Sequence, residues 1–124
     1  MTILVVNVFL FPRRSAVDQN LFRFDNRSMY FALLYDYVEN IIERRAPFRD
    51  DHLKHAQAAT QRGELMLGGA FSDVPDGAIL VFRAATQSVV EEFAKHDPYV
   101  LNGLVPKWRV RPWNVVIGTA YRPQ

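Results

Sequence analysis

The 124-residue sequence predicts an α+β fold in which helices pack on one face of an antiparallel sheet. From residue 29 onward, apolar runs of strand length occur four times, and two longer segments of helical character lie among them. Their order along the chain is β-α-β-β-α-β, which is the ferredoxin-like arrangement with two helices on one sheet face. A chain of this length forms one ordinary domain, and its 49% content of apolar residues excludes extensive disorder.

The first expected strand and helix follow each other closely. Residues 30–35 are rich in aromatic side chains and have the length of a strand. A helix that opens at Phe48 or Asp50 is expected to run to Arg62. Gly63 then stands where a helix commonly ends, because glycine adopts the left-handed conformation without strain.

This helix and the strand after it are expected to pack together. Leu53, Ala56 and Thr60 lie on one helix face, and the alanine lets that face approach the sheet closely. Residues 64–67 form the second expected strand, which ends at Gly68-Gly69. The two glycines allow a sharp turn or a close approach of the backbone to a ligand.

The second half of the chain repeats the pattern. Asp76-Gly77 marks a turn, and residues 78–82 read as a buried third strand. Residues 88–91 (Ser-Val-Val-Glu) fit a capping box, which predicts the start of the second helix. Residues 107–116 form the last expected strand, in which Pro112 limits pairing.

The strands of the expected sheet carry too many large side chains for one of its faces to be exposed to solvent. We therefore expect a homodimer in which two sheets pack face to face. The large strand residues behind this expectation are Tyr30, Phe31, Tyr35, Phe82, Trp108 and Trp113. Three basic residues alternate on the last strand and share one face, either as a solvated row or as a wall that attracts small anions: Lys107, Arg109 and Arg111.

Charge is unevenly distributed along the chain. Residues 1–28 hold four arginines and two aspartates, whereas residues 29–124 hold 11 basic and 11 acidic residues. The expected domain therefore has no excess positive charge of the kind that binds phosphate backbones, and we expect no nucleic-acid partner.

Three parts of the chain are expected. Residues 1–28 form an N-terminal extension, either loosely attached or adding a strand over residues 3–9, and residues 29–118 form the domain. Residues 119–124 form a short C-terminal tail. The apolar run at residues 3–11 is shorter than the ~20 residues of a membrane-spanning helix.

We expect a cytoplasmic protein without a membrane partner. Arg13 and Arg14 follow the N-terminal apolar run, whereas a secretory signal places its positive charge before such a run. The absence of cysteine is compatible with a reducing compartment and excludes disulfides and cysteine-based metal sites.

The most informative segment ends the second expected helix. Pro98 pushes Asp97 out of helical geometry, and a carboxylate is disfavoured at the negative end of a helix dipole. A carboxylate in such a place suggests a partner, and His52 at the start of the first helix is the best candidate. Asp97 could instead cap the Asp-Pro-Tyr turn, which is compatible with the pairing, and His52 could be a surface histidine.

Four further residues are candidates for holding a substrate. Arg49 could bind a substrate carboxylate or pair with the aspartates that follow it, and Tyr99 could offer its hydroxyl or pack under the turn. Gly69 allows a close backbone approach, and Ser72 could donate a hydrogen bond. No phosphate-loop, dinucleotide, nucleophile-elbow or H-E-x-x-H motif is present, so we expect no cofactor and no metal.

Three motifs in sequence carry a family resemblance. Arg49–Leu53 matches R-x-x-H-L, Gly63–Phe71 is similar to G-x-L-x-x-x-G-P-F, and Ser88–Tyr99 is similar to S-x-x-E-A-x-x-x-x-x-D-P-Y. The chain thus resembles the YciI-like (YCII-related) proteins from residue 29 to about residue 117. This resemblance implies a dimeric α/β-barrel fold and a histidine and an aspartate as a catalytic pair. The chain departs from the pattern at Ala70, where proline is usual, and at Phe93, where alanine is common.

Two functions from different classes follow. The first is an enzyme of lyase, isomerase or hydrolase type acting on a small aromatic or carboxylic molecule, with His52 as general acid/base and Asp97 orienting it. The second is a non-catalytic module that binds a small ligand or a partner in the same cleft.

Overall fold

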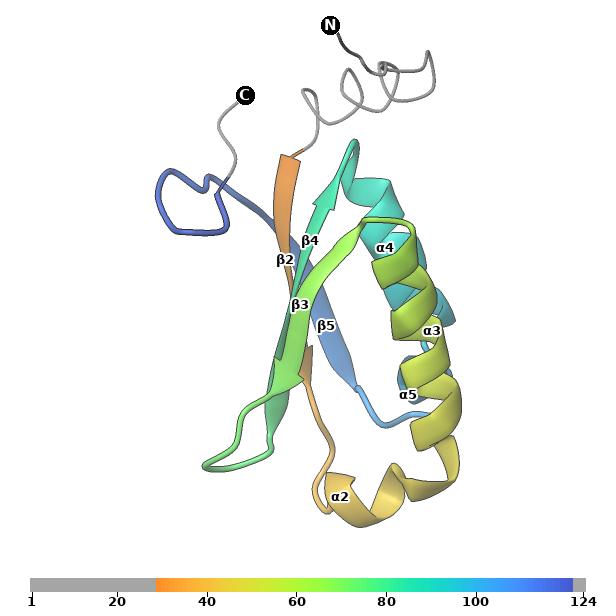
Figure 1. Cartoon of the computed structure of the whole chain (residues 1–124). Helices are drawn as coiled ribbons and strands as arrows, with labels where there is room; N and C mark the ends of the chain where they lie inside the picture. Colours follow the sequence, from red (N-terminus) through yellow and green to blue (C-terminus); the bar gives the residue numbers. More distant parts are fainter. Residues whose placement is uncertain (1–28, 122–124) are drawn as a thin grey trace, which may run out of the picture. The chain divides into compact units, whose positions relative to one another are not determined.

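The computed structural model describes residues 29–121 and shows a four-stranded antiparallel sheet (Figure 1). The strand order is β3-β4-β2-β5, so the first and third strands of the described chain lie in the centre. This order and the helices on one face confirm the expected ferredoxin-like α+β fold. The strands are β2 (Met29–Asp36), β3 (Leu65–Ala70), β4 (Gly77–Ala84) and β5 (Lys107–Trp113).

The helical elements lie on one side of the sheet, as Figure 1 shows. The two long helices are those expected, and three short helical segments accompany them. The helical elements are α2 (Ile41–Arg44), a 3₁₀ turn (Ala46–Phe48), α3 (Arg49–Gln61), α4 (Gln87–His96) and α5 (Pro98–Leu101). The helix α5 was not expected, because the sequence indicated only a turn at Asp97-Pro98.

Alternation along β2 builds the core. Phe31, Leu33 and Tyr35 are buried, whereas the residues between them are only half-buried. Phe82 lies opposite Phe31 in the register and packs edge-on against Phe93 of α4, with ring centroids 5.0 Å apart. The helix-facing side of the sheet is therefore closed by side chains from the central strands and from α4.

Gly77, the first residue of β4, lies close to the backbone of β2. A Cβ atom at this position would lie 2.6 Å from the backbone oxygen of Tyr35, a distance that side-chain carbons do not tolerate. Glycine therefore allows the close pairing with β2 at the point where Tyr35 enters the core.

Two of the expected boundaries were wrong. Strand β3 includes Gly68 and Gly69, which pair with Leu80 and Ile79 of β4, instead of ending before them. The strand continues because β4 supplies a complete pairing partner along its edge. Strand β5 ends at Trp113, which is its last residue that pairs with β2, and not at residue 116.

The expected capping box was also wrong. Helix α4 begins at Gln87, with Thr86 in extended conformation as the residue before it, so Ser88 already lies inside the first turn. The hydroxyl groups of Thr86 and Ser88 are 2.9 Å apart and bond to each other, and no side chain caps the helix.

The packing faces differ from expectation at two places. Leu53 is 46% exposed, and the helix α3 residue that is fully buried is Ala59 rather than Leu53 or Thr60. Most of the large strand residues that suggested a dimer face the helices instead of the open side of the sheet. They are Phe31, Tyr35, Phe82 and Trp108, which belong to or pack against the core.

The expected N-terminal extension (residues 1–28) lies outside the described residues. Within residues 29–121, no helix has both the length and the apolar character needed to cross a membrane.

Candidate active site

A buried carboxylate lies where α4 passes into α5. Asp97 is fully buried and in extended conformation, because Pro98 begins the short helix α5 directly after it. Its Oδ1 accepts a hydrogen bond from the backbone N–H of Tyr99 at 2.9 Å, which makes Asp97 the N-terminal cap of α5. The expected capping role of Asp97 is therefore present in the structure.

His52 reaches the same carboxylate from the first turns of α3. Its Nδ1 lies 2.8 Å from Oδ1 of Asp97, across 45 positions of sequence. The imidazole stacks on the Tyr99 ring with centroids 3.7 Å apart and planes 5° from parallel. These contacts hold the ring in one orientation, and its Nε2 makes no hydrogen bond to any of residues 29–121.

Tyr35 completes the environment of Asp97. The Tyr35 hydroxyl donates to Oδ2 at 2.7 Å, so each carboxylate oxygen accepts at least one hydrogen bond from a buried donor. Burial raises the pKa of Tyr35 well above its ordinary value of 10, and the nearby Asp97 charge and the hydrogen bond to it act in the same direction. Tyr35 therefore remains a hydrogen-bond donor throughout the neutral range.

Two hydrogen-bond donors that face Asp97 indicate which form its side chain takes. A carboxylate accepts hydrogen bonds only, whereas a protonated carboxyl would also have to donate one. The Tyr35 hydroxyl and the Tyr99 N–H both donate, so the ionised form of Asp97 satisfies the site. Charge-assisted hydrogen bonds of this kind are stronger than neutral ones. With Asp97 ionised, the His52 proton belongs on Nδ1, which leaves the lone pair of the neutral ring on Nε2.

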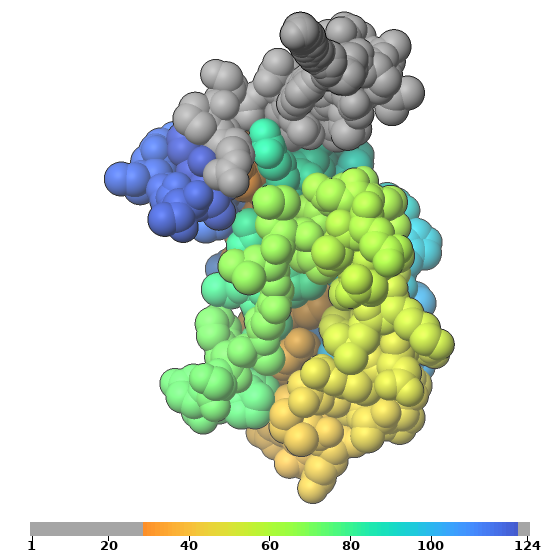
Figure 2. Space-filling view, in the orientation of Figure 1, coloured from red at the N-terminus to blue at the C-terminus, as the bar shows by residue number. Residues whose placement is uncertain are grey.

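A cleft of about 470 Å³ lies between α3 and β3, and His52 is part of its wall. Figure 2 shows the hollow between these two elements. The α3 side presents the face that carries Arg49, Leu53 and Ala56, and the β3 side presents the backbone at Gly68 and Gly69. The helix face that we expected to pack against the sheet therefore forms a wall of this cleft.

The expected substrate-holding residues fall into two groups. Arg49 and Gly69 line the cleft. Tyr99 does not, because its side chain is fully buried under His52, and its hydroxyl accepts a hydrogen bond from Arg49 Nη1 at 3.2 Å. Ser72 is exposed in the loop after β3 and is not among the cleft-lining residues.

Three residues of this region were missed by sequence reasoning. Tyr35 was counted only among the large strand residues that suggested a dimer, although a tyrosine that becomes buried needs a partner for its hydroxyl. Tyr37 and Arg45 line the cleft from the segments before and after α2. Burial raises the pKa of Tyr37 to about 12, with the neighbouring Tyr99 and Asp97 adding to the rise and Arg45 and Arg49 opposing it.

The other two histidines have separate partners. His55 Nε2 lies 2.8 Å from the backbone oxygen of Phe93 and the ring stacks on Phe93, which links α3 to α4. His96 Nδ1 lies 2.8 Å from the backbone oxygen of Glu92 at an exposed position on α4. His52 is therefore the histidine that connects the buried carboxylate with the cleft.

Comparisons with known proteins agree with this architecture. The family model of the YCII-related domain matches residues 29–114, as the motifs in the sequence indicated. No curated protein matches the chain.

Two solved structures are similar in fold. One is 5-chloro-2-hydroxyhydroquinone dehydrochlorinase (TftG) from Burkholderia phenoliruptrix AC1100, in complex with 2,5-dihydroxybenzoquinone. It is 19% identical with a TM-score of 0.60, over 69% of this chain and 94% of that chain. The other is a candidate antibiotic biosynthesis monooxygenase from Bacteriodes thetaiotaomicron VPI-5482, 11% identical with a TM-score of 0.50, over 79% of this chain and 98% of that one.

Proposed function

Because this chain belongs to the YCII-related domain family, we propose that it is an enzyme in which His52 and Asp97 form an acid–base pair. The observation that carries the proposal is the position of His52. Its Nδ1 bonds to a buried carboxylate at 2.8 Å, while the ring forms part of the wall of a cleft. General acid–base catalysis needs a proton acceptor beside the bound substrate and a second group that orients it.

The proton passes through the imidazole in this mechanism. Nε2 of neutral His52 accepts a proton from a carbon atom of the substrate or from a water molecule in the cleft. The Asp97 carboxylate stabilises the imidazolium that forms, and the Tyr35 hydrogen bond keeps the carboxylate in place. His52 then returns the proton to the substrate or to a leaving group, so that the ring ends each cycle neutral.

The reaction class that fits is elimination, isomerisation or hydrolysis of a small organic molecule. Each of these needs a base that removes a proton and an acid that returns it. The similar fold of a dehydrochlorinase supports elimination as the first reaction to test, since loss of hydrogen chloride also requires removal of a proton. The volume of about 470 Å³ is within the range of small-molecule sites.

We expect His52→Gln to slow the reaction strongly, because glutamine cannot accept the proton. A panel of small aromatic and carboxylic acids with acidic C–H bonds is incubated with the protein in D2O. Proton NMR follows both deuterium incorporation and new products. The wild type should convert at least one member, and His52→Gln should lower that rate by about 10²–10⁴-fold.

His96→Gln is the matched control, because His96 is exposed on α4 and does not line the cleft. This variant should retain the wild-type rate. Equal rates for the wild type and His52→Gln would contradict the proposal. Binding of panel members without any conversion would favour the non-catalytic ligand-binding module instead.

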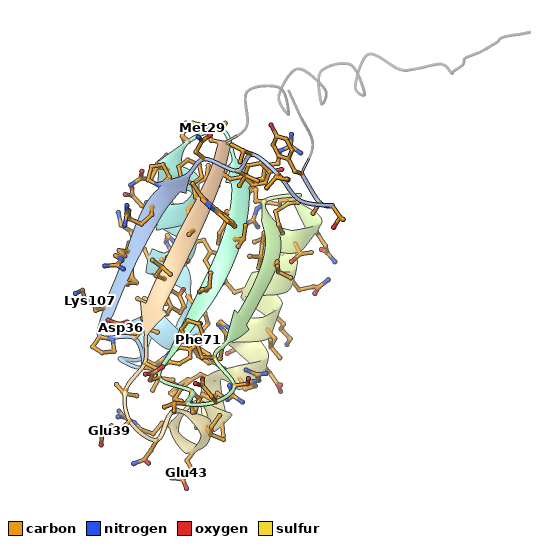
Figure 3. The ribbon with its side chains drawn as sticks, turned by 90° about the vertical axis from the view of Figure 1, so that its left-hand side faces the viewer. Met29, Asp36, Glu39, Glu43, Phe71 and Lys107 are labelled. Carbon is orange, nitrogen blue, oxygen red and sulfur yellow. The ribbon has the colours of Figure 1, made fainter. Side chains whose placement is uncertain are left out.

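We also propose that the protein forms a homodimer through the open face of the sheet. Figure 3 looks onto this face, where the four strands lie in front of the helices. The register places Leu34 beside Ile79 and Ala32 beside Val81, on the side away from the buried residues of β2. Ile79 is 38% exposed, and apolar residues on a sheet face commonly pack against a second layer. The β5 side of the same face is basic, because Arg109 and Arg111 pair with Leu34 and Ala32.

Placing a charge on this face should break the dimer. Ile79→Glu is expected to sediment as a monomer at concentrations at which the wild type sediments as a dimer, because the carboxylate would be buried without a partner. Leu101→Glu is the control, since Leu101 is a 66% exposed residue of α5 outside the sheet. A monomeric wild type at micromolar concentration would contradict this proposal.

A further inference from the structure

Two cationic side chains line the cleft beside His52. Arg45 and Arg49 both line it, and no aspartate or glutamate is among its lining residues in the described part of the chain. Both arginines are half-buried, and neither forms an ion pair with a carboxylate of residues 29–121. A partly buried guanidinium without an anion is unfavourable, so the arrangement favours an anionic ligand.

The two cations lie at one end of the cleft. The cleft follows α3 from Arg49 to Thr60, which corresponds to roughly 16 Å along the helix axis. Arg45 precedes α3 by one helical turn's length of chain, so both arginines belong to the end where this helix begins. Tyr37 lines the cleft as well, and both arginines act on its hydroxyl electrostatically.

Arg49 is already oriented for binding. Its Nη1 donates to the Tyr99 hydroxyl at 3.2 Å, which leaves the other N–H groups of the guanidinium for a ligand. Because Tyr99 also stacks on His52, one buried ring positions both the cation and the imidazole. Arg49 and His52 are three residues apart and therefore adjacent on the surface of α3.

The remainder of the cleft is largely apolar. Leu53 and Ala56 continue the α3 wall beyond His52, and Leu65 and Leu80 contribute from the sheet. A ligand that fills this space needs a charged group at one end and an apolar body next to it.

We infer that the cleft binds an organic carboxylate with a compact apolar body, held through its carboxylate by Arg45 and Arg49. Two guanidinium groups suit this anion because each can donate two parallel hydrogen bonds to it. The atoms next to the carboxylate then lie beside His52. This inference deepens the proposed function and rests on it only for the identity of the reacting atoms; binding of the anion does not require turnover.

The test uses benzoate and phenylacetate as probes, with benzamide and phenylacetamide as neutral counterparts of the same shape. Binding to the full chain is measured by NMR titration. The wild type should bind at least one of the two carboxylates at millimolar concentrations and its amide at least tenfold more weakly. Arg45→Gln and Arg49→Gln should each weaken carboxylate binding about tenfold or more, with little effect on the amide.

Arg44→Gln is the matched control, because Arg44 is an exposed neighbour that does not line the cleft. It should bind like the wild type. Equal affinity for carboxylate and amide, unchanged affinity in both arginine variants, or no binding of either carboxylate would overturn the inference. The His52→Gln variant separates this inference from the proposed function. If the variant binds the carboxylate but converts no substrate, both are supported. If it retains full turnover, only the catalytic role of His52 is contradicted.

Discussion

Replacing Asp97 by alanine is expected to lower the free energy of unfolding by about 2–5 kcal/mol. The change leaves the Tyr35 hydroxyl buried without its acceptor and removes the cap of α5 at the Tyr99 N–H. Both groups are buried away from water and have the carboxylate as their hydrogen-bond partner. When the carboxylate is removed, water does not replace it as a partner. Urea unfolding followed by tryptophan fluorescence measures the difference.

Asp97→Asn separates the structural role of this residue from its chemical role. The amide keeps the size of the side chain and one acceptor oxygen, so the loss of stability should be clearly smaller than for alanine. It carries no negative charge to stabilise an imidazolium, and turnover should therefore fall strongly in both variants. Asp73→Ala, an exposed change in the loop after β3, is the control. An Asp97→Ala protein as stable as the wild type would show that the three hydrogen bonds contribute little.

The pairing of His52 with Asp97 could be predicted because both residues lie at helix ends that sequence signals mark. Pro98 identifies the end of one helix, and the polar residues around Asp50 identify the start of the other. In a fold that places two helices on one sheet face, such ends can meet even though 45 positions separate them. The family motif added the same two residues independently.

Tyr35 could not be assigned to the site in the same way. The aromatic-rich run at residues 30–35 predicted a strand, and Tyr35 was counted toward a dimer face, whereas the structure buries it in the core. That its hydroxyl meets Asp97 depends on where α4 ends above the sheet, which is 62 positions further along the chain. The contact between the Tyr35 hydroxyl and Asp97 depends on tertiary packing, and no local sequence pattern in either segment predicts it.

The side of the sheet on which each bulky residue lies is a second property that could not be predicted from the sequence. The large strand residues suggested a dimer by their number alone, before any of them was assigned to one side of the sheet. The register shows that Phe31 and Phe82 lie opposite each other on the helix-facing side, so they belong to the core of the domain. The apolar residues that remain on the open face are Tyr30 and Trp113, which pair in the register of β2 and β5, and smaller residues such as Ile79.

Stability is expected to be independent of tyrosine ionisation below about pH 10 and to fall steeply above it. The folded state raises the pKa of Tyr35 far above 10 and that of Tyr37 to about 12, chiefly through burial. Between pH 10 and 12 the unfolded chain therefore releases protons from these residues that the folded chain retains. The unfolded state binds fewer protons in this range, so the free energy of unfolding decreases with rising pH.

The size of the effect follows from linkage. A group that ionises only in the unfolded state lowers the free energy of unfolding by about 1.4 kcal/mol for each pH unit above its unfolded pKa. Tyr35 alone should therefore remove about 2–3 kcal/mol by pH 12, and Tyr37 adds to this loss until it ionises in the folded state as well. Urea unfolding at a series of pH values between 8 and about 12 measures the slope.

Tyr35→Phe tests the assignment of this slope. At neutral pH the variant should be less stable by about 1–3 kcal/mol, because Oδ2 of Asp97 loses its donor. Above pH 10 its stability should decline less steeply than that of the wild type, so the two curves converge as the pH rises. Tyr30→Phe is the control, since this tyrosine lies on the other side of β2 and the hydroxyl that bonds to Asp97 is that of Tyr35. Parallel curves for the wild type and Tyr35→Phe would mean that another group controls alkaline unfolding, and that the Tyr35 hydroxyl is not kept un-ionised by burial beside the carboxylate.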